Sequence, residues 1–401
     1  MKIIVVTPIY PADFNPKGTT HLLHYFTREW VKLGHDVVVY DISARYPKLF
    51  YLISKIFHSF LTSKLGIIVP QKPPVDKIDL NEGVKINHIS IPKIIPHGRY
   101  SKKRLNIISD MLVAKIKHDN VDYIIGHWVN PTLDIIHSIK QNVDKPCCIV
   151  LHETTDQLFH YYGSKTKEMI NNIDIVGFRS KALKDNFETI FGVHKCFMAY
   201  SGIPDTFIDV ADNRIPKSFK EISRFIFVGT LMERKYPSEI LISLKNSFKD
   251  NIFSIIYIGE GKESRRIISL SKQLKIQKNV TLIGCIPRND IISYLEKSEV
   301  FIMISKDEVF GLVYLEAMTM GCITIASRNE GIDGIIIDGY NGFLCESGNV
   351  QELSNIITRI RQMSESQLNV VSLAARNTAR LYSDKIVAKQ YIDNVIKLSV
   401  S

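Results

Sequence analysis

The sequence predicts an α/β protein of two successive domains, each with a parallel sheet covered by helices on both faces. Short continuous apolar runs alternate with segments in which apolar residues recur at helical spacing, a pattern typical of parallel strands buried on both faces. The alternation pauses in a polar stretch at 205–222 and then resumes. The length of 401 residues also suits two or three domains.

The elements follow in order from this alternation. In the first half, a helix is expected at 20–33, and strands are expected at 2–7, 36–41, 123–127, 147–152 and 173–177. In the second half, strands are expected at 224–229, 253–259, 280–284, 300–305 and 322–327, and the stretch 351–400 is mostly helical in pattern. Because open parallel sheets bind ligands at the carboxyl ends of their strands, two such domains are expected to form a binding cleft.

Composition excludes several classes of protein. The chain is 45% hydrophobic and 23% charged, so disorder and collagen-like structure are not expected. Its six cysteines contain no C-x-x-C pair, which favours a reducing cytosol over a disulfide scaffold or a zinc site. The first apolar run is too short for a signal peptide, and no uncharged apolar stretch reaches the roughly 18 residues of a membrane span.

The net charge of +10 is concentrated in one segment. Residues 45–117 contain 14 Lys and Arg against 4 Asp and Glu, and the rest of the chain is balanced. From residue 206 onward there are 25 basic and 22 acidic residues. The basic character therefore describes a local patch, which predicts a local anionic partner.

The segment 305–321 has the strongest chemical signal. Glu308 stands in a loop after a predicted strand, Gly311 permits a close backbone approach, and Glu316 falls within the first turns of a helix. The backbone N–H groups at a helix N-terminus are free to bind an anion. Two carboxylates therefore flank a phosphate-sized site, although a loop acid beside an amphipathic helix is the simpler alternative for a lone pair of glutamates.

Several motifs share the order and spacing of one family. They are Glu308 and Glu316; Gly34-His35-Asp36-Val37; Val228-Gly229-Thr230-Leu231 with Lys235; Gly259-Glu260-Gly261; Leu282-Ile283-Gly284; and Asp338-Gly339-Tyr340-Asn341-Gly342-Phe343. Over nearly the whole chain this pattern resembles the retaining nucleotide-sugar glycosyltransferases with an E-x7-E motif, a family 4-like group within group 1.

The resemblance implies a GT-B fold, in which two Rossmann-like domains face each other across a cleft and C-terminal helices cross back to the first domain. The implied domains are an acceptor-binding domain at 1–205, a donor-binding domain at 206–375, and a C-terminal helix at 376–401 that packs on the first domain.

The resemblance also implies roles in donor binding. Glu316 is expected to bind the ribose hydroxyls, Glu308 the hydroxyls of the donor sugar, and Lys235 the diphosphate leaving group. Main-chain amides are expected to meet the sugar and diphosphate at Val309, Phe310, Gly311 and Leu312. The other donor-binding candidates are Gly18, Thr230, Arg234, Gly259 and Ile286.

No metal or other cofactor is expected beyond a UDP- or GDP-sugar co-substrate. The sequence has no Asp-x-Asp turn where a metal would be held. Lys235 and a helix N-terminus can neutralise the charge that builds on the leaving diphosphate.

The sequence departs from the family pattern at three places. Thr230 stands where an arginine usually precedes the lysine by five residues, and Arg234 is a neighbouring substitute of different geometry. The usual Gly-Gly-x-x-Glu is replaced by the segment 330–334, so that Gly334 occupies the position of the acid. The paired glycines after the first strand are represented by Gly18 and Thr19.

Two histidines end predicted strands, His127 in Gly-His-Trp and His152 in Leu-His-Glu-Thr. A hydrogen-bonded structural role is the simpler interpretation of such a histidine. The resemblance favours His152 as a contact to the donor sugar, so that Glu308, His152 and Lys235 form the candidate catalytic set. His127, Glu153 and Asp156 are acceptor-side candidates. Front-face attack, in which the leaving phosphate takes the acceptor's proton, is the expected mechanism.

The basic segment includes a predicted amphipathic helix at 49–65. Apolar residues at 49, 52, 53, 56, 57, 60 and 61 share one face of that helix, and polar residues lie opposite. Such a helix is typical of a segment that lies on an anionic membrane surface. Packing of the helix on its own domain is the alternative, and the sequence leaves both open.

The sequence thus favours a hexosyltransferase that acts on a glycan or lipid-linked acceptor in bacterial capsule, O-antigen or exopolysaccharide synthesis. The expected location is the cytoplasm, with peripheral binding to the inner face of the plasma membrane through residues 45–117. A sugar-nucleotide epimerase or hydrolase of the same fold is the first alternative, against which the E-x7-E motif argues. A nucleic-acid-binding protein is the second, and no binding module supports it, so no nucleic acid partner is expected.

Overall fold

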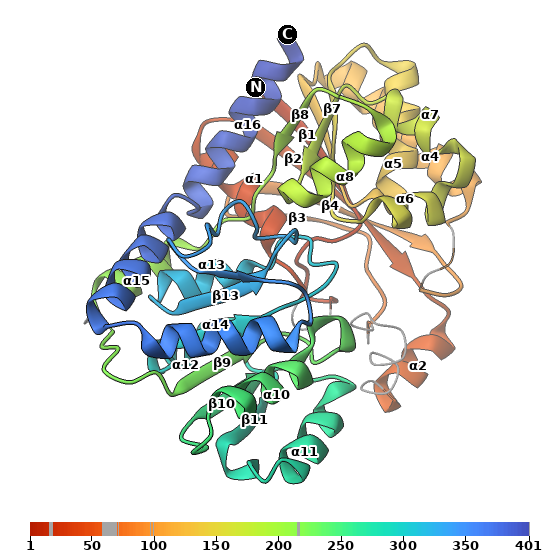
Figure 1. The fold of residues 1–401 in the computed structure, drawn as a ribbon. Helices are drawn as coiled ribbons and strands as arrows, with labels where there is room; N and C mark the ends of the chain where they lie inside the picture. Colours follow the sequence, from red (N-terminus) through yellow and green to blue (C-terminus); the bar gives the residue numbers. More distant parts are fainter. Residues whose placement is uncertain are drawn as a thin grey trace. The chain divides into compact units, whose positions relative to one another are not determined.

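The computed structural model describes residues 1–15, 19–57, 70, 72–96, 98, 100–214 and 217–400. The chain divides into two compact units, each an α/β layered structure (Figure 1). The first unit contains Met1–Arg179, Leu183–Tyr200 and Asp384–Ser401. The second unit contains Ser180–Ala182 and Ser201–Ser383.

The described residues of the first unit form an eight-stranded sheet in the order β3-β4-β2-β1-β5-β6-β7-β8. Its neighbouring strands are parallel, except that β3 and β4 form an antiparallel pair at the edge. The strands are β1 (Lys2–Thr7), β2 (Asp36–Arg45), β3 (Lys77–Asn81), β4 (Val84–Pro92), β5 (Tyr123–His127), β6 (Cys147–Leu151), β7 (Ile175–Phe178) and β8 (Cys196–Met198).

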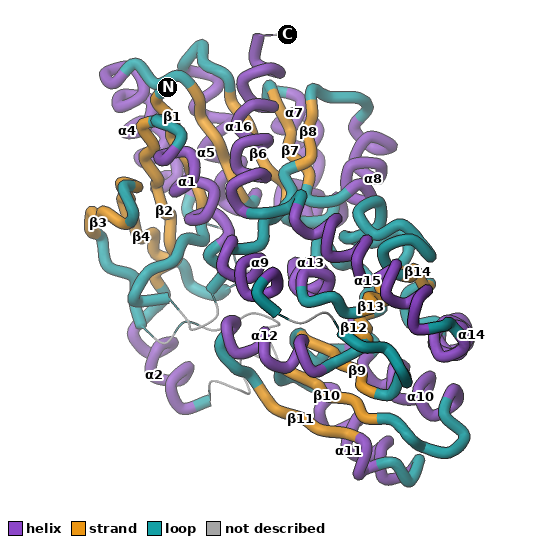
Figure 2. The backbone as a smooth tube through the Cα atoms, turned by 90° about the vertical axis from the view of Figure 1, so that its left-hand side faces the viewer, coloured by secondary structure: helices purple, strands orange, loops and turns teal. Residues whose placement is uncertain are grey.

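Helices cover both faces of this sheet, as the tube view in Figure 2 shows. They are α1 (Leu22–Lys32), α2 (Lys48–Ile56), α4 (Lys102–Asp119), α5 (Val129–Asn142), α6 (Thr155–Tyr162), α7 (Thr166–Asn171), α8 (Lys181–Phe191), the short 3₁₀ helix η1 (Gly163–Lys165) and the C-terminal α16 (Asp384–Val400). The last helix packs against α1, and the indole N–H of Trp30 donates to the carbonyl of Ala388 at 2.8 Å. The apolar face of α16 thereby completes the core of the first unit.

The described residues of the second unit form a six-stranded, fully parallel sheet in the order β11-β10-β9-β12-β13-β14. The strands are β9 (Arg224–Val228), β10 (Ser254–Ile258), β11 (Val280–Gly284), β12 (Val300–Met303), β13 (Ile323–Ser327) and β14 (Phe343–Cys345). The helices are α9 (Asp205–Asp212), η2 (Glu233–Lys235), α10 (Pro237–Ser247), α11 (Glu263–Gln273), η3 (Gln277–Asn279), α12 (Arg288–Lys297), α13 (Leu312–Thr319), α14 (Val350–Gln362) and α15 (Glu365–Arg380).

The two-sheet fold confirms the predicted fold class, and the predicted strands are present within a residue or two of their expected bounds, except that β2 continues to Arg45 where an end at 41 was expected. The β3–β4 hairpin was not predicted, because β4 alternates buried and exposed residues at the sheet edge instead of forming a continuous apolar run. The short strands β8 and β14 were also not predicted, since their three residues leave too little pattern to read.

The unit boundaries differ from those expected from sequence. The chain leaves the first unit after Tyr200 and returns to it at Asp384, where 205 and 376 were expected. Residue 376 falls within α15, which packs on α13 and β13 of the second unit. The backbone N–H of Ile203 donates to the carbonyl of Tyr382 at 2.8 Å. The segment that enters the second unit and the segment that leaves it are therefore joined to each other within that unit.

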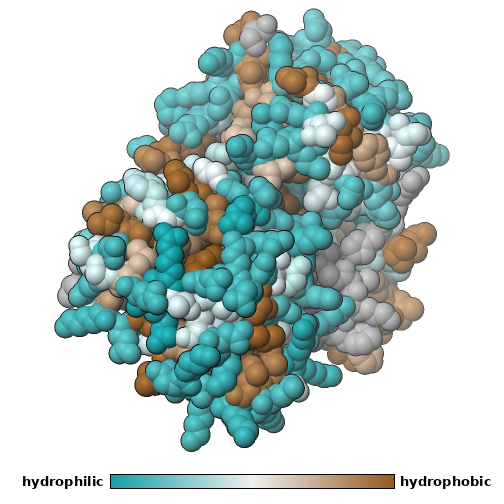
Figure 3. All heavy atoms as spheres, in the orientation of Figure 1, coloured by the Kyte–Doolittle hydropathy of each residue, from teal (hydrophilic) through white to brown (hydrophobic). Residues whose placement is uncertain are grey.

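Helix α2 presents its apolar side chains to solvent. Tyr51 and Ser54 face inward, where the Ser54 hydroxyl donates to the carbonyl of Pro70 at 2.9 Å. Leu52 is 57% exposed and Ile56 is 66% exposed, and apolar atoms are visible in this region of the surface (Figure 3). The predicted helix continued to residue 65, and positions 58–65 lie outside the described residues. No helix among the described residues is long and apolar enough to cross a bilayer.

Candidate active site

In the second unit, the loop between β12 and α13 carries the first glutamate of the predicted motif. Helix α13 begins at Leu312 after Gly311, whose φ of +74° is in the left-handed region. A Cβ on Gly311 would lie 2.4 Å from the ring of Tyr314, so only glycine fits this turn. Val309 and Leu312 are half-buried and Phe310 is buried. The turn therefore brings the amides of 309–312 to the N-terminal end of α13.

Glu308 forms an ion pair with Lys235 at 3.0 Å, and Arg234 lies 3.6 Å from the same carboxylate oxygen. Lys235 stands on η2, and its Nζ also lies 3.5 Å from the sulfur of Met303. The Arg234 guanidinium donates to the carbonyls at 306 and 307, at 3.0 and 3.2 Å. Arg234 thus supports the loop, while Lys235 is the cation held by Glu308.

The segment that departs from the family pattern holds this loop in place. A carboxylate oxygen of Glu330 accepts the backbone N–H of Glu308 at 2.8 Å, and burial raises the pKa of Glu330 above its usual range. Gly331 lies so close to the loop that a Cβ there would stand 2.5 Å from the backbone nitrogen of Phe310. The carboxylate of this segment that contacts the loop is therefore Glu330. Gly334 instead forms a backbone turn with a φ of +94°, a conformation that favours glycine.

Glu316, on α13, is almost fully buried and pairs with Arg288 at 2.6 Å. The Arg288 guanidinium also lies over the ring of Phe207, 5.3 Å from its centroid. Ile286 is half-buried two residues earlier in the same connection. The sequence did not identify Arg288, because its partner Glu316 is distant in sequence. The signal that could have indicated it is its position at the start of a helix, two residues after the candidate Ile286.

Two glycine turns of the second unit approach each other closely. Gly229 and Gly259 follow β9 and β10, and the N–H of Leu231 donates to the carbonyl of Glu260 at 2.9 Å. A Cβ on Gly259 would lie 2.0 Å from the Gly229 carbonyl oxygen. Thr230 is exposed between these turns. The candidate Gly18 lies outside the described residues.

In the first unit, three aromatic side chains form a hydrogen-bonded row. His127 Nδ1 lies 3.0 Å from His152 Nε2, and His127 Nε2 lies 2.9 Å from the hydroxyl of Tyr391 on α16. Burial lowers the pKa of His127 to about 3 and that of His152 well below its usual value, and the nearby Arg179 cation acts in the same direction. Both imidazoles are therefore neutral at pH 7.

Trp128 packs on the ring of His152, and Glu153 holds its backbone. The Trp128 indole stacks on that ring with centroids 4.0 Å apart, from a backbone with φ of +55°. The two oxygens of Glu153 accept the backbone N–H groups of Val129 and His152, both at 3.1 Å. Burial raises the pKa of Glu153 to about 7. Glu153 thus uses both oxygens on the backbone, and Asp156 lies apart on the exposed first turn of α6.

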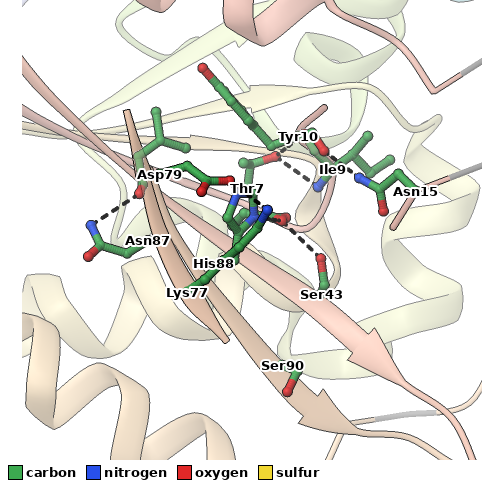
Figure 4. A network of polar contacts seen from close by, with 12 residues as sticks. Thr7, Ile9, Tyr10, Asn15, Ser43, Lys77, Asp79, Asn87, His88 and Ser90 are labelled. Atoms are coloured by element: carbon green, nitrogen blue, oxygen red, sulfur yellow. Dashed lines mark hydrogen bonds and ion pairs between the residues drawn. The ribbon is translucent and has the colours of Figure 1, made fainter. Parts of the chain in front are cut away.

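A second polar network crosses the carboxyl end of β1 and its neighbours in the first unit (Figure 4). The buried Asp41 carboxylate lies 2.8 Å from His88 Nδ1, and Asp79 lies 3.3 Å from His88 Nε2 and 2.9 Å from Lys77. These residues come from β2, β3 and β4. Their spacing in sequence carries no motif, so the network was not predicted. It ties the β3–β4 hairpin to the sheet.

The sequence is similar to those of known glycosyltransferases. Residues 211–377 match the family described as glycosyl transferases group 1. The chain is 25% identical over 272 residues to an uncharacterized glycosyltransferase of Methanocaldococcus jannaschii, a match that covers 66% of this chain and 73% of the relative. It is 28% identical over 158 residues to an Escherichia coli UDP-Gal:alpha-D-GlcNAc-diphosphoundecaprenol alpha-1,3-galactosyltransferase, covering 38% of this chain and 40% of the relative.

Solved structures share the whole fold. Sucrose-phosphate synthase from Thermosynechococcus elongatus superposes with a TM-score of 0.71 at 15% identity, and the match covers 99% of each chain. The Anabaena protein HepE, solved with UDP and glucose, gives 0.66 at 16% identity, with 99% of this chain and 100% of that chain covered. The family match, the relatives and the shared fold support a glycosyltransferase of the GT-B architecture, in which residues 211–377 match group 1.

The close approach of the two glycine turns predicts the effect of Gly259→Ala. The added Cβ would meet a backbone oxygen and would require a φ of +131°, so we expect the free energy of unfolding to fall by about 3 kcal/mol or more. Thermal denaturation measures this. The control is Gly34→Ala, where φ is +86° but nothing lies within 4 Å of the added Cβ, and where about 1 kcal/mol is expected. Equal losses would contradict the steric argument.

The raised pKa of Glu153 predicts a pH-dependent stability. Since this pKa is about 7 in the folded protein and 4.5 ordinarily, the folded state binds the extra proton between these values. The free energy of unfolding of the wild type should therefore fall relative to Glu153→Gln as pH rises through this window, by up to about 3 kcal/mol. Denaturant titrations from pH 5 to 8 test this, with Asp156→Asn as the exposed control. Parallel curves for the wild type and Glu153→Gln would refute it.

Proposed function

We propose that the protein transfers a hexose-type sugar, with retention of anomeric configuration, from a UDP- or GDP-sugar to a glycan or lipid-linked acceptor in bacterial capsule, O-antigen or exopolysaccharide synthesis. One observation carries this proposal most directly, the ion pair of Glu308 and Lys235 beside the N-terminus of α13. A cation beside the N-terminus of a helix suits a diphosphate leaving group.

The donor-side chemistry follows from this pair. Negative charge accumulates on the β-phosphate as the glycosidic bond breaks, and Lys235 with the amides of 310–312 would neutralise it without a metal. Glu308 would hold Lys235 in position and accept from hydroxyls of the donor sugar. Glu316 would accept from the ribose hydroxyls, and its partner Arg288 holds that buried carboxylate in orientation.

The first unit would supply the groups around the reacting sugar. His152 is neutral and is held by Trp128 and by the backbone contact of Glu153, so it would act through a hydrogen bond and not as a cation. Among the residues that the structure describes, the carboxylate next to it in sequence is Glu153, and both oxygens of Glu153 already accept backbone N–H groups. This supports front-face attack, in which the leaving phosphate takes the acceptor's proton.

The relatives support the substrate classes. The Escherichia coli relative is named for a UDP-galactose donor and a diphosphoundecaprenol-linked acceptor, and a protein of the same fold was solved with UDP and glucose. A sugar-nucleotide epimerase or hydrolase of this fold is the alternative. It is distinguished by the products, because a transferase releases the nucleoside diphosphate faster when an acceptor is present and forms a new glycoside.

The donor-site proposal predicts that Lys235→Ala and Glu308→Ala each lower kcat by about 100-fold. Lys235→Ala removes the cation that stabilises the leaving group, and Glu308→Ala removes the carboxylate that holds this cation and would accept from the donor sugar. Release of UDP or GDP from a panel of nucleotide sugars, with and without a polyprenyl-diphosphate glycan acceptor, measures this. Lys249→Ala, an exposed lysine of the same unit, is the matched control and should retain full activity. Unchanged turnover in both site variants would refute the assignment.

We also propose that helix α2 docks on an anionic membrane, which would place the enzyme peripherally at the inner face of the plasma membrane. Five apolar side chains of this segment are exposed, at 49, 52, 53, 56 and 57. Lys48, Lys55 and Lys72 are exposed close to them in sequence. Apolar insertion combined with positive charge suits anionic lipid, and the same surface would bring the enzyme to a lipid-linked acceptor.

Membrane docking predicts that the double variant Leu52→Asp/Ile56→Asp sediments with vesicles of anionic phospholipid about 10-fold less than the wild type, because it places two negative charges on the inserting face. Val193→Asp, which changes an apolar residue that is 89% exposed elsewhere in the same unit, is the control. The proposal fails if the wild type does not bind such vesicles at low salt, or if both variants bind as the wild type does.

A further inference from the structure

The row of His152, His127 and Tyr391 joins the candidate catalytic histidine to the C-terminal helix. His152 follows β6, His127 ends β5, and Tyr391 is in the middle of α16. All three belong to the first unit. His127 is fully buried and Tyr391 nearly so, so neither is placed to touch a ligand. His152 is half-buried, and its Nδ1 forms no hydrogen bond among the described residues.

The row has few possible proton arrangements. Each imidazole is neutral, so each carries one N–H and one lone pair. The contact of 3.0 Å between His127 Nδ1 and His152 Nε2 therefore contains a single proton. In a neutral ring, a nitrogen that accepts a hydrogen bond leaves the hydrogen on the other nitrogen. The direction of the hydrogen bond at either end of the row therefore decides the tautomer of both rings.

The hydroxyl of Tyr391 stands at one end of the row and sets this direction. The Tyr391 hydroxyl has two neighbours that could accept its hydrogen, His127 Nε2 at 2.9 Å and the thiol of Cys148. Sulfur is the weaker acceptor, and a phenol O–H is a stronger donor to an imidazole lone pair than an imidazole N–H is to a phenol oxygen, so we take Tyr391 to donate to His127 Nε2. His127 Nδ1 then carries its hydrogen and donates to His152 Nε2. The remaining nitrogen of His152, Nδ1, must then carry the N–H. The atom of His152 that is left open is thereby a hydrogen-bond donor.

We infer that Tyr391 is a positioning residue which, acting through His127, keeps a proton on His152 Nδ1 so that this atom donates to a hydroxyl of the bound sugar. The inference rests on the proposed glycosyltransfer, in which His152 contacts the donor sugar. It assigns to the C-terminal helix an indirect part in the chemistry, through His127 and His152. Trp128 keeps the ring plane in place, and the row from Tyr391 sets which nitrogen carries the hydrogen.

The test is the variant Tyr391→Phe, which removes only the hydroxyl. His127 can then place its hydrogen on either nitrogen, and His152 becomes a mixture of tautomers. We expect kcat for transfer to fall about 10-fold while KM for the nucleotide sugar changes less than about twofold, the usual scale for losing a group that orients a catalytic histidine.

The chain offers a matched control for this substitution. Tyr123 lies on the same strand as His127, and its hydroxyl contacts Ser399 of the same helix at 3.3 Å. Tyr123→Phe thus removes a hydroxyl contact between β5 and α16 without touching the histidines, and it should keep wild-type kcat. Thermal denaturation of both variants shows whether either loses its fold.

Two further measurements separate positioning from packing. In protein labelled with ¹⁵N-histidine, the nitrogen chemical shifts of His152 should report a hydrogen at Nδ1 in the wild type and in Tyr123→Phe, and an averaged state in Tyr391→Phe. In a His152→Ala background, Tyr391→Phe should cause no additional loss of kcat, because the residue through which it acts is gone.

Unchanged His152 shifts in Tyr391→Phe, or additive losses in the double variant, would overturn the inference. The spectrum needs no turnover, so it tests the row even if the wild type transfers no sugar. Absence of sugar transfer by the wild type would instead contradict the proposed function.

Discussion

The hydrogen bond from the Glu308 backbone to the Glu330 carboxylate is the constraint on which the second unit's site depends. This hydrogen bond fixes the loop that follows β12. The loop in turn determines where Glu308 contacts Lys235 and where helix α13 begins. The close approach of Gly331 to this loop leaves no space for a side chain. The Glu330 carboxylate and Gly331 thus hold this connection in the position that the proposed donor site requires.

The site in the first unit depends on burial in a different way. His127 and His152 are neutral because burial disfavours the charged imidazolium. Each hydrogen bond of the row then contains one proton, so the tautomer of one ring depends on that of the other. The same burial requires α16, which covers His127 with Tyr391. The end of the chain is therefore part of the core of the first unit, although it follows the whole of the second unit in sequence.

Much of this arrangement was predictable, and the misses have physical causes. The continuous apolar runs marked the parallel strands, and the spacing of Glu308, Glu316 and Lys235 made the loop after β12 the candidate donor site before any contact was known. Arg288 and Tyr391 were not identified, since their partners lie far away in sequence and no local pattern records them. Glu330 was noted as a departure from a motif, and only its contact with the Glu308 backbone explains what it does there.

By itself, the sequence determined the α/β class, the two sheets, the restriction of positive charge to residues 45–117, and the residue types available for a diphosphate. Those properties follow from local periodicity and composition, which each stretch of chain carries alone. The tertiary structure decided which carboxylates are occupied by backbone, which histidine nitrogen is left open, and which face of α2 points outward. These depend on burial and on partners distant in the chain, and so they exist only when the chain is folded.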